Sequence, residues 1–197
     1  LVDKKVSDYK NIINPGTNKK KLSSILHTKL NSARKRMINS KYPFSEGLFG
    51  RDLSKDKEVK EADIIHLHWV NDGFLSIKNI RKLAKLDKPI VWTLHDMWPF
   101  TGGCHYSLSC DKYKTHCGAC PLLNSKKEKD ISYKVFQKKL KYLADMDIHI
   151  VTLNNWMYNC ARESRLFKNK NIHIIPNGID TNLYKPIDKD FARQVLN

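Results

Sequence analysis

Short apolar runs alternate along this chain with longer segments in which apolar residues recur every three or four positions. The short runs are typical of buried strands and lie at 62–69, 89–94, 147–153 and 171–175. The longer segments have helical spacing and lie at 73–86, 131–144 and 155–167, with another beginning at 188. Because strands alternate with helices, we expect βαβ units and an α/β fold with a mainly parallel sheet.

Two of the helical segments carry more detailed predictions. In 131–144 the spacing turns Val135, Leu140 and Leu143 inward and leaves the lysines on the outer face. Asn154 precedes the segment at 155–167, and its side chain is expected to cap that helix by accepting backbone N–H groups.

The chain divides into three parts by composition. Residues 1–60 are rich in lysine, 61–176 hold the α/β core with a cysteine-containing loop at 96–130, and 177–197 are expected to form a linker and the start of a further domain. One amphipathic helical face is expected in the first part, at Leu22, Ile25, Leu26 and Leu30.

A formal net charge of +16 over 197 residues is the unusual feature of the composition. It indicates a surface that attracts phosphates on nucleic acid, on nucleotide-linked substrates or on anionic lipid, unless the lysines only maintain solubility. A hydrophobic fraction of 41% argues against a disordered chain. No apolar run reaches the ~18 residues that span a bilayer, and the first residues lack the order of a signal peptide. We therefore expect a cytoplasmic protein.

The apolar run at 89–94 ends in His95 and Asp96, and the carboxyl ends of buried strands are where α/β sheets bind ligands. His95 is the first candidate, because an imidazole can hydrogen-bond a sugar hydroxyl or stabilise charge beside a departing phosphate. A core histidine satisfied by the backbone is its structural alternative. Asp96 is a second polar contact or the cap of a turn. His66 and His68 point to one face of their strand, where packing is the favoured role and lining a cleft the alternative.

Four cysteines follow in the same loop, at Cys104, Cys110, Cys117 and Cys120. The last pair is a CxxC, which suits tetrahedral zinc, although the first pair is spaced more widely than in common zinc ribbons. Three interpretations stay open: a structural zinc held by four cysteines, packed free thiols, and redox or disulfide chemistry.

Five other residues have less specific sequence patterns. Gly102 and Gly103 either bring backbone N–H groups close to a phosphate or sugar, or form a hairpin of the loop. His105 and His116 are substitute metal ligands. Cys160 stands apart on a helical segment and is expected to be a small buried apolar residue.

Taken together, these patterns resemble the amino-terminal domain of retaining glycosyltransferases of family 4, whose GT-B fold consists of two facing Rossmann-like domains. The resemblance covers roughly 61–197, and its closest branch builds bacterial surface polysaccharides of the colanic-acid type. We therefore expect one half of a GT-B fold, the acceptor side, truncated at both ends. The strings that carry the resemblance are DIIHLHW (63–69), GFLSI (73–77), PIVWTLHDMWPFTGGC (89–104), the CxxC with Pro121, VTLNNW (151–156) and IIPNGIDTNLYKP (174–186).

The resemblance also implies an activity and roles for several residues. The activity is transfer of a hexose from a nucleotide-sugar to a lipid-linked or growing glycan, with retained configuration and no catalytic metal. His95 would contact the transferred sugar, and His68 would line the cleft on the acceptor side. We expect further substrate contacts at Asp96, Gly102 and Gly103. The donor domain of the family, with its Glu-x7-Glu pair, has no counterpart within these residues.

The implied partners are a nucleotide-sugar donor, a glycan or lipid-linked acceptor, and the anionic inner face of the plasma membrane, but no nucleic acid. The basic charge fits this setting. Two alternatives remain, a zinc-stabilised nucleic-acid-binding module and a non-catalytic scaffold. The first is supported by the charge, the cysteine cluster and the aromatic residues Tyr106 and Tyr113.

Overall fold

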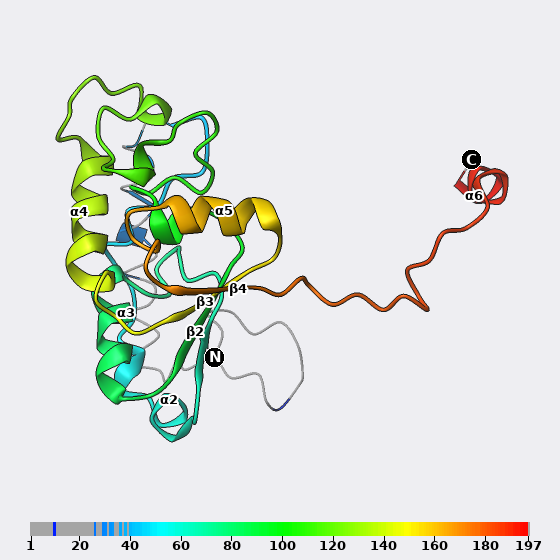
Figure 1. Ribbon diagram of the computed structural model, residues 1–197, viewed down its shortest axis with the longest axis horizontal. Coiled ribbons are helices and arrows are strands. Elements are labelled where there is room, and N and C mark those ends of the chain that lie inside the picture. Colours follow the sequence, from blue (N-terminus) through cyan, green and yellow to red (C-terminus); the bar gives the residue numbers. More distant parts are fainter. Residues whose placement is uncertain are drawn as a thin grey trace.

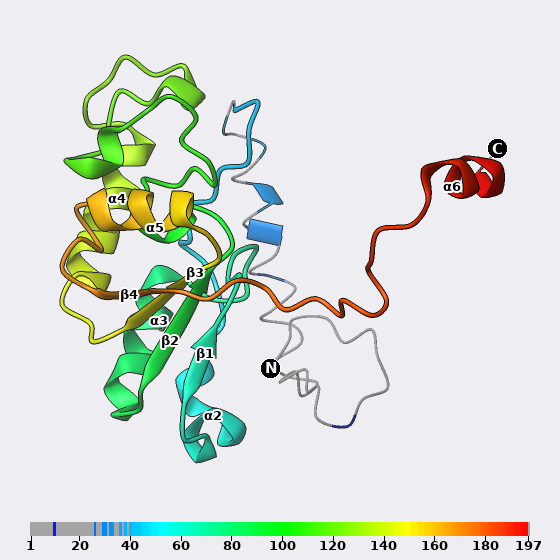
Figure 2. The same cartoon turned by 45° about the vertical axis from the view of Figure 1, so that its right-hand side comes forward.

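The protein is described by a computed structural model that covers residues 40–196, together with positions 10, 26, 29, 30, 32, 33, 36 and 38. Its centre is one parallel sheet whose strands lie in sequence order (Figures 1 and 2). The strands are β1 (Ile65–Leu67), β2 (Ile90–Leu94), β3 (His149–Thr152) and β4 (Asn171–Ile174). Each lies within a segment that the sequence predicted to be a strand, so the α/β fold with a parallel sheet is confirmed.

Helices connect the strands. Helices α3 and α4 contact each other and lie on one side of the sheet (Figure 1). Residues 177–188 lead away from the sheet to the last helix, as both views show (Figures 1 and 2). The α-helices are α2 (Lys57–Glu61), α3 (Ile77–Leu83), α4 (Ile131–Leu143), α5 (Asn155–Glu163) and α6 (Lys189–Leu196). Short 3-10 helices are η1 (Leu53–Lys55), η2 (Ala84–Leu86), η3 (Trp98–Phe100), η4 (Lys112–Lys114) and η5 (Pro121–Leu123).

The core is built around the aromatic residues of β2 and the loop that follows it. Trp92, Trp98, Phe100 and Phe167 are all at most 1% exposed. The rings of Phe100 and Phe167 meet edge to face, with centroids 5.9 Å apart. Aromatic pairs in this geometry contribute more than their buried area alone. The segment after β2 is therefore part of the core and holds the end of the strand rigidly in place.

The face of β1 that points away from the core carries histidines. In the sheet register His66 pairs with Val91, which in turn pairs with His149, so the three side chains share one face. Both histidines are exposed, whereas Ile65 and Leu67 are buried. His66 and His68, for which packing was the favoured role, therefore lie on the exposed face of β1 and outside the core. The period of two put them on one face, and the sheet buries the other face of β1.

Helix boundaries differ from the predicted ones where capping residues intervene. The helix predicted at 73–86 begins only at Ile77, because Ser76 Oγ accepts a hydrogen bond from the backbone N–H of Asn79. The helix predicted at 155–167 ends at Glu163, where Ser164 turns to an extended conformation. Asn154 caps that helix as predicted, accepting from the backbone N–H of Met157 at 2.8 Å.

Helix α4 departs from its predicted orientation at one position. Val135 and Leu143 face inward as predicted and Leu140 is half-buried, but Lys139 is completely buried instead of pointing outward. In the amino-terminal part, the expected amphipathic positions Leu22 and Ile25 lie outside the described residues. Leu26 and Leu30 are helical and exposed.

Candidate functional site

Two histidines meet at the carboxyl edge of the sheet. His68 follows β1 and His95 follows β2, and His68 Nδ1 lies 3.0 Å from His95 Nε2. Both side chains are exposed. A hydrogen bond between two imidazoles requires one neutral ring to accept, so the pair carries at most one positive charge while the bond exists. The arrangement presents a polar, orientable group where open α/β sheets bind ligands. His95 is therefore not the buried core histidine that was its structural alternative.

The histidine pair is held by the strands beneath it. Trp92 Nε1 donates to the carbonyl oxygen of His68 at 3.0 Å, which fixes the end of β1 against β2. His66 Nε2 lies 2.8 Å from Thr93 Oγ1, and its ring centroid is 4.2 Å from that of His68. Partial burial and the nearby charges of His66 and His95 lower the pKa of His68. His68 therefore favours its neutral form, which can accept a proton or orient His95.

Asp96 points into the protein. Its Oδ1 accepts from the backbone N–H of Trp98 at 2.8 Å, and its Oδ2 lies 2.6 Å from His105 Nδ1. The other ring nitrogen of His105 is 2.9 Å from Ser45 Oγ. Asp96 thus acts as the turn cap that the sequence offered as one alternative. Both nitrogens of His105 have partners, so this ring is not placed as the substitute metal ligand that we expected. His116, the other substitute, is exposed.

The buried side chain of Lys139 binds the backbone of the loop that follows His95. Its ammonium group donates to the carbonyl oxygens of Trp98 and, at 3.0 Å, of Thr101, and lies 3.7 Å from the centre of the Trp98 ring. Burial lowers its pKa to about 7. Sequence reasoning missed this residue, although its spacing of four from Val135 and from Leu143 placed it on the inward face.

Gly102 and Gly103 are enclosed by protein groups. A side chain at Gly102 would lie 2.6 Å from the carbonyl oxygen of Ser132 and 2.7 Å from Cys117 Cβ. At Gly103, where φ is +128°, it would lie 2.5 Å from the Phe44 ring. Both glycines therefore let the loop pack closely against its neighbours. The contact of these glycines with substrate stays a prediction.

The four cysteines of the loop converge on one small cavity. Cys104, Cys110, Cys117 and Cys120 all line it, and its volume is about 20 Å³. All are free thiols, as is the half-buried Cys160. Among residues 40–196 and the few earlier positions described, no three His, Cys, Asp or Glu side chains are placed to share a metal ion. The structural zinc therefore stays a prediction from the spacing, and the proposals below do not depend on it.

The thiols should differ in reactivity. Burial raises the pKa of Cys104 to about 11 and that of Cys117 to about 12, so both are protonated near neutral pH and are poor nucleophiles. Under a short iodoacetamide pulse at pH 8, followed by mass spectrometry, we expect the half-exposed Cys110 and Cys160 to be alkylated first. In denaturant all five cysteines should react at similar rates. Equal labelling of Cys104 and Cys110 in the folded protein would contradict the burial shown by the structure.

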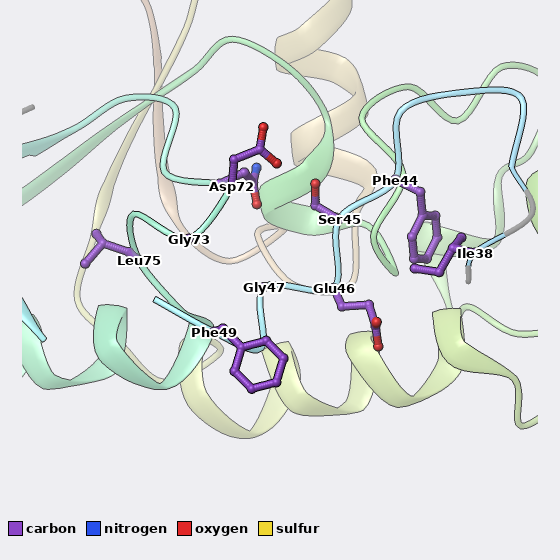
Figure 3. A pocket seen from close by; sticks show the side chains of 10 residues that line it. Ile38, Phe44, Ser45, Glu46, Gly47, Phe49, Asp72, Gly73 and Leu75 are labelled. Atoms are coloured by element: carbon purple, nitrogen blue, oxygen red, sulfur yellow. The ribbon is translucent and has the colours of Figure 1, made fainter. Parts of the chain in front are cut away.

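Two hollows lie beside the site. One, of about 20 Å³, lies between the loop that contains Ser45 and Glu46 and the turn at Asp72 (Figure 3). The other is larger, about 260 Å³, and follows β1, with Val59 and Leu83 among its apolar walls. Neither contains His95 in its lining.

No helix in the described part of the chain is both long and apolar enough to cross a membrane. Comparison with known proteins places the chain among transferases of sugars. The model of the family named Glycosyltransferase Family 4 matches residues 32–183. The chain is 35% identical over 91 residues to a putative colanic acid biosynthesis glycosyl transferase, WcaC, of Escherichia coli K12. That match covers 42% of this chain and 22% of the relative, and no solved structure matches.

Proposed function

Because the chain belongs to glycosyltransferase family 4, we propose that the natural protein transfers a hexose from a nucleotide-sugar to a lipid-linked or growing surface polysaccharide. The observation that carries the proposal is the exposed His95 at the end of β2, hydrogen-bonded to His68 at the end of β1. The relative named for colanic acid biosynthesis supports a polysaccharide as the product.

In this proposal His95 contacts the transferred sugar and His68 orients it from the acceptor side. The bond between the anomeric carbon and the nucleotide diphosphate breaks, and an acceptor hydroxyl oxygen bonds to the same carbon. The acceptor proton leaves with the diphosphate. His95 can donate to a sugar hydroxyl or to oxygen on which charge develops, and preorganised donors of this kind stabilise transition states. We propose that configuration is retained and that no catalytic metal takes part.

The charge of the chain suits such an acceptor. A net charge of +16 attracts diphosphates and anionic headgroups, so we propose that the protein works at the cytoplasmic face of the plasma membrane. The partners in this proposal are a nucleotide-sugar, a glycan or lipid-linked acceptor and the membrane surface. Nucleic acid is not among them.

The proposal is tested with the natural protein that carries this chain. It is incubated with UDP- and GDP-hexoses and a lipid-diphosphate-linked sugar, and the product is analysed by proton NMR. We expect release of the nucleoside diphosphate and a new glycosidic linkage with the anomeric configuration of the donor. A product of opposite configuration would overturn retention alone. Donor hydrolysis without transfer, across the whole panel, would overturn the proposed activity.

A further inference from the structure

Three aromatic side chains stand at the same edge of the sheet as His95. Trp69 follows β1, Tyr106 lies in the loop after β2, and Trp156 is in the first turn of α5 after β3. They are 47%, 48% and 51% exposed. These rings are half-exposed and follow three successive strands. Exposed apolar groups of this kind often mark binding sites.

The rings surround the loop that begins at His95. Tyr106 and Trp156 stack with centroids 6.2 Å apart and an angle of 21° between their planes. The Tyr106 hydroxyl donates to the carbonyl oxygen of His95 at 3.4 Å. On the other side the Trp69 ring lies 6.3 Å from that of His105. The three rings are therefore attached to the histidine site and are not scattered surface residues.

A polar group beside Trp69 lacks a hydrogen-bond partner among the described residues. Asn71 is only 3% exposed, and its Oδ1 accepts no hydrogen bond from any described residue. Asn71 lines a cavity of about 10 Å³ with His68, Trp69 and His95. That space is about the size of one water molecule. Buried carbonyl oxygens are nearly always hydrogen-bonded, so this oxygen indicates a place for a hydroxyl of a ligand or for the water that binds it.

The chemistry of this surface selects the ligand. The rings supply flat apolar faces, and the small cavity beside Trp69 has no lysine or arginine in its lining. A diphosphate would need positive charge here, whereas a pyranose ring offers an apolar face of C–H groups to an aromatic ring and hydroxyls to its edge. We propose that Trp69, Tyr106 and Trp156 form a subsite for a neutral sugar ring of the acceptor glycan. The assignment of this sugar to the acceptor rests on the proposed function.

The test measures binding, so it does not depend on turnover. Saturation-transfer difference NMR is recorded on the natural protein with methyl β-glucoside, methyl β-galactoside and UDP as separate probes. We expect transfer to the ring protons of a methyl glycoside, and at least a tenfold loss of affinity in a Tyr106→Ala, Trp156→Ala double variant. The Tyr106→Phe variant should keep the signal, because the ring remains. Ile64→Ala removes an apolar side chain that is 58% exposed at the other end of β1, and should bind as wild type does.

The outcomes separate the two claims. An unchanged glycoside signal in the double variant would overturn the subsite. Loss of the UDP signal alone would also overturn it, because the rings would then bind a nucleobase. Loss of glycoside binding in the double variant supports the subsite even if no transfer is found. In that case the proposed activity fails while the sugar-binding surface stands.

Discussion

Replacement of His95 by alanine is expected to lower kcat for sugar transfer by about 10²–10³, the usual effect of removing one donor aimed at developing charge. The side chain is exposed and contributes little to the core, so the variant should fold normally. The readout is the rate of nucleoside diphosphate release by the natural protein at saturating donor, with circular dichroism to check folding.

His149→Ala is the matched control for that experiment. His149 is an exposed histidine of the same sheet, and its ring stacks on that of His173, 6.1 Å away. It starts β3, at the end of the strands opposite to His95. We expect the turnover of the His149→Ala variant to stay within about twofold of wild type. Near-normal turnover of the His95 variant would remove this residue from the mechanism.

Because of Lys139, the free energy of unfolding should rise as the pH is raised above 7. Its pKa is about 7 in the folded protein and near 10.5 when the chain is unfolded. Between these values the unfolded chain holds a proton that the folded chain lacks, so raising the pH favours folding. From pH 7 to pH 9 we expect the free energy of unfolding to rise by about 2 kcal/mol. Above pH 9 the effect reverses in part, because the buried thiols of Cys104 and Cys117 stay protonated and those of the unfolded chain ionise.

The Lys139→Met variant isolates this contribution. It keeps the length of the side chain and removes the charge, so the free energy of unfolding of the variant should not show the rise between pH 7 and pH 9 that wild type shows. Lys134→Met, which changes an exposed lysine of the same helix, should leave the rise intact. The measurement is urea denaturation followed by tryptophan fluorescence, since Trp92 and Trp98 lie in the core and Lys139 contacts the Trp98 ring. Parallel pH profiles for wild type and Lys139→Met would contradict the assignment.

Most of the fold could be predicted because periodicity and caps are local signals. The β-branched run that contains β2 had no reasonable alternative to a buried strand, and Asn154 marked the start of α5 correctly. The early end of that helix at Ser164 could not be predicted. Its cause is tertiary, because the turn buries Leu166 and Phe167 against the core.

The site was predictable only in part. That His68 and His95 lie at neighbouring strand ends follows from parallel topology, but their hydrogen bond depends on ring orientation, which no spacing encodes. The buried pair of Asp96 and His105 joins residues nine apart in an irregular loop, where no period applies. Lys139 is different. The helical period placed it inward, and the general preference of lysine for solvent outweighed that signal.

The most direct test of the account is a crystal structure of the natural protein with an intact nucleotide-sugar bound. We predict that an imidazole nitrogen of His95 lies within hydrogen-bond distance, about 2.6–3.2 Å, of the hexose or of the oxygen it leaves. His68 should remain bonded to the other side of that ring. A hexose bound away from the carboxyl edge of β1 and β2, with His95 in contact only with solvent, would contradict the central claim.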